Sequence, residues 1–346
     1  MKEPLKIAIV GCGRIGQWHH IQTILKMREA KLVAICEKNI HLAKEIAQRF
    51  NIIRYYVDYA EMLNKEEVDM VDICTPPQTH FALSIQALQV GCHVLVEKPI
   101  ALNVKEVDEL AGIAKKNNVK LCQVHNKLFE PVMIKACAMV KEGKIGDLTG
   151  IDIQVLQSHA STNFKLSDRE HWCHNLPAGI LTETLPHPIY LAAAFLGKLE
   201  PVAIHTEKSS NYDWVLADEI RIVLKGRKGM GTVSYSHSSP KSKTIIDVHG
   251  TRSHLRIDLM NSALTAYGAG TETRFSRALE NLNQSFSLLA SSLYTTLSVM
   301  SRNFHNGHYT LIQRFVESIQ RDTEPPVTLQ EARDVIEVIE KVTAQI

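Results

Sequence analysis

The sequence lacks a long apolar run, a paired-cysteine motif and an excess of either charge. Its 346 residues hold 39 lysines and arginines against 37 aspartates and glutamates, for a net charge of +2. No stretch of eighteen apolar residues and no charged-then-apolar leader is present. These absences argue against a nucleic-acid partner, a membrane-bound protein and a secreted one. We expect a cytoplasmic protein that is long enough for two domains.

Cysteine and histidine give no metal site by their spacing. The seven cysteines are odd in number, include no Cys-x-x-Cys pair and lie in apolar segments, which is typical of reduced core thiols. Among the sixteen histidines, His171 and His174 have a ligand-like spacing, but no second pair at zinc spacing accompanies them. We therefore predict that the protein holds no metal.

A glycine-rich motif follows the first strand-like segment. Residues 5–10 are a short apolar run, and Gly-x-Gly-x-x-Gly follows at residues 11–16, before a segment with helical apolar spacing. In such a motif the first glycine allows a tight turn, the second lets the backbone approach a pyrophosphate, and the third lets helix and strand pack closely. The free N–H groups of the helix N-terminus would hold the anion. We expect a dinucleotide to contact Gly11, Gly13, Arg14, Ile15 and Gly16.

An acid ends the next predicted strand. Residues 31–36 form a second apolar run, and Glu37 follows it about twenty residues after the glycine motif. A carboxylate at this place accepts hydrogen bonds from the adenosine ribose and repels a 2′-phosphate, so it favours NAD over NADP. Lys38, beside it, could instead bind that phosphate, which leaves NADP open as the cofactor.

Strand-like and helix-like segments go on alternating through the first third of the chain. Residues 68–74 predict a strand, 80–90 and 101–117 helices and 119–124 a last strand, with short connections. This alternation predicts right-handed crossovers and a parallel sheet. We therefore predict a Rossmann-type, doubly wound α/β domain over residues 1–123.

Lys98 ends a further apolar strand of this domain, because the run at residues 94–96 is followed by Glu97, Lys98 and Pro99. Ligands of open α/β sheets bind at the carboxyl ends of the strands, so a lysine there can bring positive charge to a substrate oxygen. Pro99 stops the strand. A lysine at a strand end is otherwise an ordinary solvated residue, and the glycine motif upstream is what favours the functional interpretation.

The second half of the chain alternates apolar and polar side chains, as half-buried strands do. We predict an α+β domain over residues 124–346, built on a largely antiparallel open sheet. This domain would bind the substrate across a cleft from Lys98, and its sheet would form the contact of a homodimer or homotetramer. The last helices of the chain could pack back on the Rossmann domain. The alternating segments are residues 151–155, 219–222, 231–235, 244–248 and 254–257.

His187 and Glu183 are the best candidates to act with Lys98. They are four residues apart, so on one helix they would share a face. A histidine beside a carboxylate can take the proton of an alcohol near neutral pH. Pro186 breaks a helix unless it lies in the first turn. The alternative is therefore a helix that begins near Pro186 and leaves Glu183 in the turn before it.

The segment just before Glu183 is rich in polar and aromatic side chains, which suit a polyhydroxylated ligand. Asn126, after the last Rossmann strand, is expected to contact cofactor or substrate. We expect substrate contacts among His159, His171, Trp172, His174 and Asn175.

Apolar residues recur every three or four positions from Phe275 to Met300. This spacing predicts an amphipathic helix of about twenty-five residues, about 37 Å long. Two interpretations stay open: packing on the Rossmann domain or on a neighbouring subunit, and a lid or an arm in an oligomer interface. Its sparse positive charge argues against membrane binding.

These residues together resemble the Gfo/Idh/MocA family of NAD(P)-dependent oxidoreductases over essentially the whole chain. The resemblance rests on the glycine motif with His19 after it, on Cys74-Thr75-Pro76-Pro77 with His80, and on Glu97-Lys98-Pro99 at a strand end. Asn126 with Phe129-Glu130-Pro131 and the Glu324-Pro325-Pro326 segment near the end are also similar to the family.

The resemblance implies a hydride exchange between nicotinamide and a carbohydrate-like alcohol carbon. It places the family's lysine at Lys98, which would hydrogen-bond the reacting oxygen, and its acid/base histidine at His187. Glu183 stands where the family usually has aspartate, and Tyr190 stands where an acid is often found. The further cofactor contacts that we expect are Thr75, Pro76, His80, Glu97, Lys98 and Asn126.

We therefore predict an NAD-preferring dehydrogenase of a sugar or sugar derivative, whose partner is a small carbohydrate-like molecule. Two alternatives stay open. In the first, tightly bound NAD is reduced and reoxidised within one cycle, for a net elimination, hydrolysis or epimerisation. In the second, the protein is a catalytically silent sensor of NAD or another ligand, although the presence of both Lys98 and His187 argues against it.

Overall fold

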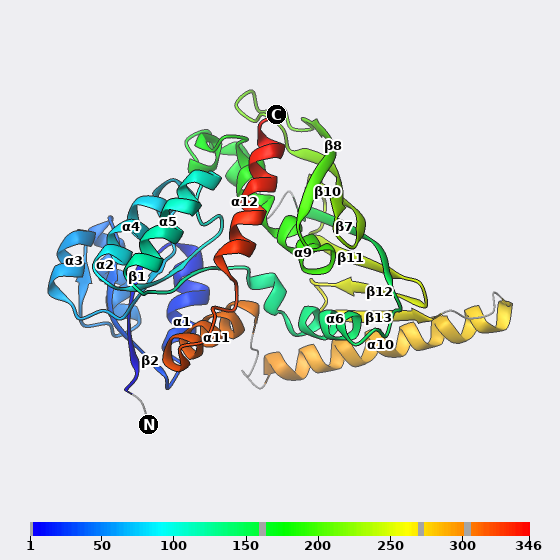
Figure 1. Cartoon of the computed structure of the whole chain (residues 1–346), viewed down its shortest axis with the longest axis horizontal. Coiled ribbons are helices and arrows are strands. Elements are labelled where there is room, and N and C mark those ends of the chain that lie inside the picture. Colours follow the sequence, from blue (N-terminus) through cyan, green and yellow to red (C-terminus); the bar gives the residue numbers. More distant parts are fainter. Residues whose placement is uncertain (1–2, 159–163, 269–272, 301–305) are drawn as a thin grey trace. The chain divides into compact units, whose positions relative to one another are not determined.

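Two sheets of different kinds organise the chain (Figure 1). The structure is a computed structural model that describes residues 3–158, 164–268, 273–300 and 306–346. It divides the chain into two units. Unit 1 consists of residues 1–126 with 307–337, and unit 2 of residues 127–306 with 338–346. Residues 307–337, from the end of the chain, thus belong to the same unit as the glycine motif.

The sheet of unit 1 is wholly parallel and has the strand order β3-β2-β1-β4-β5-β6. The inner strands are apolar and almost fully buried, as expected for strands covered on both faces. The chain order reverses between β1 and β4, and in such sheets ligands bind at the carboxyl ends of the strands beside this reversal. The strands are β1 (Leu5–Val10), β2 (Ala30–Cys36), β3 (Tyr55–Tyr56), β4 (Met70–Ile73), β5 (His93–Val96) and β6 (Leu121–Gln123).

Local caps define where the helices of unit 1 begin. Asn39, Asp58 and Asn103 precede three of them, and each side chain accepts a hydrogen bond from the first turn. The helices are α2 (Ile40–Arg49), α3 (Tyr59–Lys65), α4 (His80–Gln89), α5 (Val104–Lys116) and α11 (Gly307–Arg321), and α12 (Leu329–Thr343) begins in this unit. The predicted Rossmann-type fold is confirmed.

Unit 2 is built on a seven-stranded sheet of order β13-β12-β11-β7-β10-β9-β8. Every neighbouring pair is antiparallel except β7 with β10, which is parallel. Buried and exposed residues alternate along β7, so one face of the sheet is covered. The strands are β7 (Leu148–Ser158), β8 (Leu199–Glu207), β9 (Glu219–Gly226), β10 (Gly229–Ser239), β11 (Lys243–Gly250), β12 (Ser253–Asp258) and β13 (Ala263–Gly268).

Helices cover the buried face and one end of this sheet. Helix α9 (Pro186–Leu196) packs on β7 and β10, and α6 (Pro131–Lys141) packs on β12 and β13. The short helix α8 (Ile180–Thr184) precedes α9. Helix α10 (Arg274–Met300) runs beside β13 and continues past it (Figure 1). The predicted, largely antiparallel second sheet is confirmed.

Several details of these elements were not predicted. Strands β8 and β13 have no clear alternation in the sequence, and the parallel pairing of β7 with β10 leaves no local signal.

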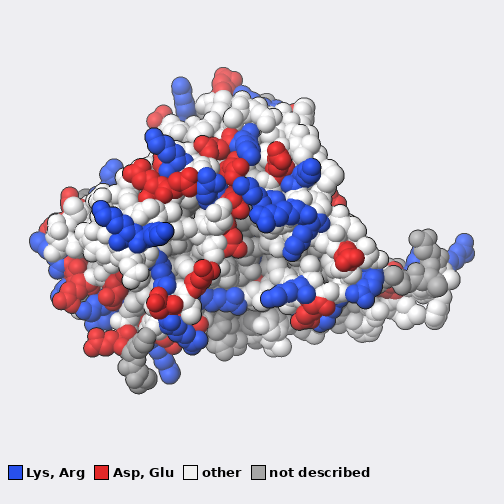
Figure 2. All heavy atoms as spheres, in the orientation of Figure 1, with Lys and Arg blue, Asp and Glu red and all other residues white. Residues whose placement is uncertain are grey.

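The seven cysteines are free thiols, all buried or half-buried. Lysines, arginines and acidic residues are intermixed on the face shown in Figure 2. Within the described part of the chain, no helix is both long and apolar enough to span a bilayer.

Candidate functional site

The glycine motif forms the turn after β1, and its glycines are needed for different reasons. Gly11 has a φ of +91°, and a Cβ on it would lie 2.8 Å from Thr75 Cγ2. A Cβ on Gly16 would lie 2.4 Å from the carbonyl oxygen of Gly11. At Gly13, a Cβ would meet no heavy atom of the described residues within 4 Å. The loop is therefore closed behind Gly11 and Gly16 and open in front of Gly13, where a pyrophosphate would approach.

The helical turn after the motif is wide. Segment η1 (Gly16–Ile21) is π-helical and continues as α1 (Gln22–Ile24). Such turns are rare and are frequently found at functional sites. Arg14 and Ile15, which precede the turn, are exposed and accessible to a ligand.

Glu37 is held beside this loop. Its Oε2 accepts a hydrogen bond from the Cys12 amide at 2.9 Å, and its Oε1 accepts one from the Asn39 amide at 3.0 Å. The carboxylate is thus fixed at the carboxyl end of β2, on the glycine loop itself. Lys38 is exposed. This arrangement suits an acceptor for ribose hydroxyls.

The turn after β4 is tied to the end of β5 by His80. This buried side chain places Nε2 2.8 Å from the Thr75 carbonyl oxygen and Nδ1 2.7 Å from that of Pro99. Burial lowers the pKa of His80, although both carbonyl contacts oppose that shift. His80 therefore holds two loops together, whereas Thr75 is half-buried and Pro76 is exposed at the edge of the sheet.

Lys98 lies two residues after the end of β5, half-buried, and is joined to Pro99 by a cis peptide bond. Its amide donates to Oε2 of Glu97 at 3.1 Å. Glu97 is 8% exposed, so its carboxylate faces the interior of unit 1 while the next residue reaches outward. The predicted lysine is therefore at a strand end, in the same unit as the glycine loop.

A buried cluster that sequence reasoning missed lies behind Glu97. The Oε1 atom of Glu97 is 3.1 Å from His20 Nε2 and 3.5 Å from His308 Nε2. His20 Nδ1 is 2.8 Å from Asp72 Oδ2, and His308 Nδ1 is 3.4 Å from the Asn126 amide nitrogen. The ligand atoms of His20, Glu97 and His308 are close enough together to hold a metal ion, as are those of His20, Asp72 and Cys74.

His187 lies in the first turn of α9, which begins at Pro186 as the alternative predicted, but Glu183 lies on the short helix α8 and not in a turn. Its Nδ1 is 2.7 Å from the hydroxyl of Tyr190, which also accepts a hydrogen bond from the Lys127 amide at 3.2 Å. Tyr190 is 1% exposed. Within residues 178–192, only Glu183 and His187 are partly exposed.

Glu183 lies on α8 and forms an ion pair with Lys165, with 3.2 Å between Oε1 and Nζ. The backbone carbonyl of Lys165 accepts a hydrogen bond from His174 Nε2 at 2.7 Å. This pair connects the helix of Glu183 to the polar segment before it. Lys165 was not predicted, since nothing in the spacing indicates that it approaches Glu183.

The other predicted substrate residues lie on or beside η4 (Trp172–Asn175). The rings of His171 and Trp172 are 5.0 Å apart, and burial, with the nearby charge of Lys165, lowers the pKa of His171. Asn175 is exposed. His159 lies outside the described residues. Buried His237, on β10, has no hydrogen-bond partner for either ring nitrogen among the described residues.

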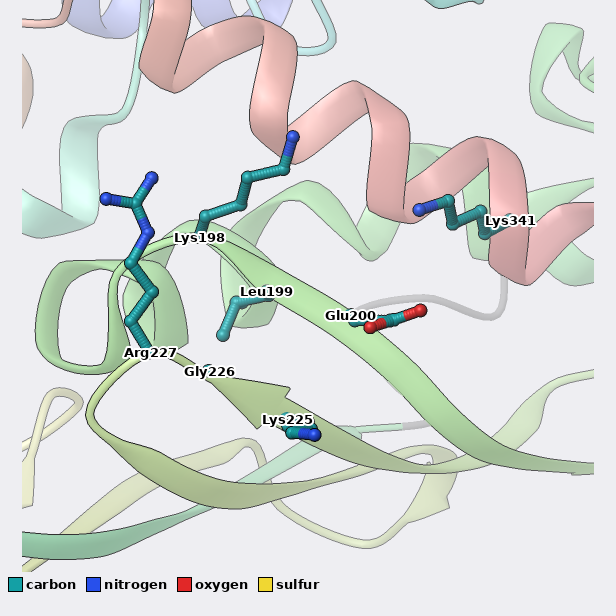
Figure 3. Close-up of a pocket in the computed structure, with 7 residues that line it drawn as sticks. All are labelled: Lys198, Leu199, Glu200, Lys225, Gly226, Arg227 and Lys341. Atoms are coloured by element: carbon teal, nitrogen blue, oxygen red, sulfur yellow. The ribbon is translucent and has the colours of Figure 1, made fainter.

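A basic pocket of about 380 Å³ lies at the start of the β8–β9 pairing (Figure 3). Glu200 is the register partner of Lys225 in this ladder. Figure 3 shows Arg227 and Lys198 extending from the same end of the two strands, and Lys341 reaching in from α12. None of the predicted site residues lines this pocket.

Comparison with known proteins identifies the family. The model described as an oxidoreductase family with an NAD-binding Rossmann fold matches residues 5–125. The companion model of the C-terminal alpha/beta domain matches residues 138–346. The chain therefore belongs to the Gfo/Idh/MocA family of oxidoreductases, and the resemblance seen in the sequence is confirmed.

Individual relatives are distant. Oxidoreductase P35 of Formosa agariphila is 23% identical over 269 residues, which cover 77% of this chain and 83% of that protein. D-glucoside 3-dehydrogenase of Escherichia coli is 30% identical over 145 residues, only 42% of this chain and 41% of that enzyme. The crystal structure of the WlbA dehydrogenase from Bordetella pertussis with NADH and UDP-GlcNAcA has a TM-score of 0.82 at 18% identity, covering 99% of this chain and 95% of that chain.

Proposed function

We propose that the protein is an NAD-dependent dehydrogenase that acts on an alcohol carbon of a sugar, polyol or nucleotide sugar. Lys98 carries the proposal, because it places a cation two residues beyond the carboxyl end of a parallel strand, in the unit that contains the glycine loop. A lysine there can stabilise the negative charge that develops on a substrate oxygen.

The residues around the glycine loop fit a dinucleotide. The open space before Gly13 suits the pyrophosphate, and the fixed carboxylate of Glu37 suits ribose hydroxyls. A 2′-phosphate would meet this carboxylate and be repelled, which favours NAD over NADP. Relatives of the same fold are described with NADH or NAD⁺ bound.

In this proposal the chain's own groups handle the proton and the charge. Bound NAD supplies the carbon that receives or returns the hydride. His187 takes the hydroxyl proton at Nε2, since its Nδ1 is occupied by Tyr190. Lys98 hydrogen-bonds the same oxygen. Glu183, the acid four residues before His187, is ion-paired with Lys165, so its charge is balanced within unit 2.

The substrate class rests on two supports. Relatives include a D-glucoside 3-dehydrogenase, a scyllo-inositol 2-dehydrogenase and a UDP-N-acetylglucosamine 3-dehydrogenase, all enzymes of polyhydroxylated compounds. The polar and aromatic side chains before Glu183, such as His171 and Trp172, provide the hydrogen bonds and flat surface that sugars require.

The test uses the purified full chain. Its bound nucleotide is identified by mass spectrometry, and NADH formation is then followed with glucosides, inositols and nucleotide sugars. With the best substrate, Lys98→Met should lower kcat about 10²–10³-fold and leave NADH binding, followed by fluorescence, within twofold of wild type. The matched control is Lys105→Met, an exposed lysine on α5.

Normal turnover of Lys98→Met would refute the assigned role of this lysine. Retained NAD with no net reduction by any of these compounds would refute simple dehydrogenation and favour an internal redox cycle. Absence of NAD binding in wild type would refute the proposed function as a whole.

A further inference from the structure

The interior of unit 1 contains a row of ionisable side chains that the proposed reaction does not use. Asp72, His20, Glu97 and His308 are at most 8% exposed and come from four different elements: β4, η1, the end of β5 and α11. Burying charge is costly unless it is paired, so such a row needs a reason.

The geometry defines the protonation of His20. Both ring nitrogens face carboxylate oxygens, Asp72 Oδ2 at 2.8 Å and Glu97 Oε1 at 3.1 Å. An ionised carboxylate only accepts hydrogen bonds, so a ring held between two ionised carboxylates carries a proton on each nitrogen. Although burial lowers the pKa of His20, the charge of Asp72 and contacts with Asp72 and Cys74 raise it well above its usual value. His19, on the same helical turn, has its pKa lowered to about 4 by burial and by the adjacent His308 and His20.

Glu97 is in turn held on both oxygens. Its Oε1 lies between His20 and His308, and its Oε2 accepts from the Lys98 amide. Burial raises the pKa of Glu97, but the hydrogen bonds from His20 and His308 hold it well below its usual value. The carboxylate that stays ionised here is one residue from Lys98, so its position sets the backbone from which that side chain extends.

We propose that His20 is a positioning residue for hydride transfer. Its ring lies between Asp72 Oδ2 and Glu97 Oε1, so it holds Glu97 in place from the side of Asp72 and fixes the strand end that carries Lys98. This proposal rests on the proposed function, and it adds His20, Asp72 and His308 to the machinery. Displacement of a catalytic group by about 1 Å can cost about 10²-fold in rate, so a support of this kind has a measurable effect.

One test is independent of activity. The full chain is labelled with ¹⁵N-histidine, and the His20 ring signals are assigned as those missing in His20→Gln. We expect both nitrogens to stay protonated from pH 6 to pH 9, with and without a chelator. A neutral ring at pH 7, or a signal that changes on chelation because a metal occupies the cluster, would overturn the proposal.

A second test separates positioning from simple charge neutralisation. His20→Met leaves Asp72 and Glu97 without their shared cation, so both the Tm and kcat should fall, kcat by at least about 10-fold. Adding Asp72→Leu removes one of the two carboxylates that lose this cation and should restore part of the Tm. If His20 positions Glu97, kcat stays low in this double variant while NADH affinity stays within twofold of wild type.

Recovery of wild-type kcat in the double variant would overturn the positioning role. His41→Gln, an exposed histidine on α2, is the matched control and should change neither quantity. If no alcohol substrate is found at all, the proposed function fails, but the ring protonation of His20 is still decided by the labelled spectra.

Helix α10 supplies a separate observation, because its apolar side faces away from its own unit. Six positions are partly covered, and all of them are polar: Ser276, Glu280, Gln284, Ser287, Ser291 and Thr295. The Ser287 hydroxyl donates to the Leu264 carbonyl oxygen on β13 at 2.9 Å. A second stripe, on nearly the opposite side, is 45 to 77% exposed: Phe275, Leu279, Leu282, Phe286, Leu289, Leu293 and Leu297.

We infer that this apolar stripe binds the same stripe of a second copy of the chain. Seven side chains exposing about 100 Å² each give about 700 Å², close to the ~800 Å² that each partner buries in a stable interface. Residues 281–300 contain no charged residue, and an interface between identical surfaces is favoured when no like charges meet. The same lack of lysine and arginine disfavours an anionic membrane surface.

The test is the mass of the full chain in solution by sedimentation velocity. We expect Phe286→Glu with Leu293→Glu to reduce the wild-type mass by half or more, with an unchanged Tm. Asn281→Glu adds a charge to the same helix off the stripe and should keep the wild-type mass. A monomeric wild type, an unchanged mass of the double variant, or binding of the wild type to lipid vesicles would each overturn the inference.

Discussion

At the scale of single residues, the partner of His187 is a hydroxyl group. A carboxylate could only accept from the histidine Nδ1, but the Tyr190 hydroxyl can donate to it or accept from it. For His187 to be a base at Nε2, its proton must lie on Nδ1, so Nδ1 donates to the Tyr190 oxygen both before and after Nε2 takes a proton.

Removing that hydroxyl tests the pairing. We expect Tyr190→Phe to lower kcat about 10-fold, because the imidazole loses the contact that orients it, with little change in the KM for NAD. Steady-state kinetics in both reaction directions give the measurement. Tyr55→Phe, at an exposed tyrosine of β3, is the control. Equal kcat values for Tyr190→Phe and wild type would show that the hydroxyl is not needed.

Glu37 provides a second prediction at this scale, concerning the choice of cofactor. Glu37→Ser removes the charge that would repel a 2′-phosphate and leaves Lys38 free to attract it. We expect the ratio of kcat/KM for NAD to that for NADP to fall about 10–100-fold, that is, by about 1.4–2.7 kcal/mol. An unchanged ratio would mean that Glu37 does not contact the adenosine ribose.

The sequence allowed Lys98, Glu37 and His187 to be singled out because each stands at the end of a recognisable element. The partners that hold them could not be found in this way. Tyr190 was noted only as a departure from the family, and Asp72 reads as one polar residue in an apolar strand. The role of Asp72 depends on its contact with His20, 52 residues earlier in the sequence, which no local spacing encodes.

At the scale of elements, two glycines of the same loop should affect different properties: Gly16 the stability of the fold, and Gly13 the binding of NAD. A Cβ on Gly16 would meet the Gly11 carbonyl oxygen at 2.4 Å, but one on Gly13 would enter open space. We therefore expect Gly16→Ala to lower the Tm and abolish NAD binding together, whereas Gly13→Ala should keep the Tm and weaken binding about 10-fold or more. Calorimetry and NADH fluorescence measure the two effects.

Gly112→Ala is the control for this pair. Gly112 lies on helix α5, and a Cβ there would meet no heavy atom of the described residues within 4 Å. Wild-type NAD affinity in Gly13→Ala would show that the dinucleotide does not approach the loop from the open side.

The strength of the local signal decided which elements could be predicted. β1, β2 and β5 are apolar runs, and α10 has a clear helical period, so all four were found close to their bounds. β3 has only two residues, and β8 includes Pro201 and exposed Val202, which break the alternation. The π-helical geometry of η1 has no signal in the sequence, where the apolar spacing predicts an ordinary helix.

At the scale of the whole molecule, each unit combines two segments that are far apart in the sequence. Residues 307–337 return to unit 1 and bring His308 to Glu97, more than two hundred residues away in the sequence. The sequence suggested that the last helices could pack back, but only the structure shows which buried acid they meet. The charge of the interior is thus set by distant segments.

Buried histidines make the stability of the whole molecule depend on pH. Burial lowers the pKa of His125 to about 3 and that of His237 to about 4, one in each unit. Both values are below the ~6.5 of an unfolded histidine. The stabilisation is therefore complete above pH 6.5 and is lost as the pH falls towards 4. At pH 4.5, each of these two histidines should lower the free energy of unfolding by about 2–3 kcal/mol relative to its value above pH 6.5.

The urea concentration at the unfolding midpoint of the wild type should accordingly decrease as the pH is lowered from 7 to 5. The midpoint of His237→Met should decrease less, because the methionine side chain cannot bind a proton. His20 acts in the opposite sense. Its raised pKa gives stability that is present below pH 6.5 and lost as the pH rises, so His20→Met should reduce the loss of stability on the alkaline side. Urea unfolding of the three proteins from pH 5 to pH 9 measures both trends. Parallel curves for all three would mean that neither histidine changes its protonation on unfolding.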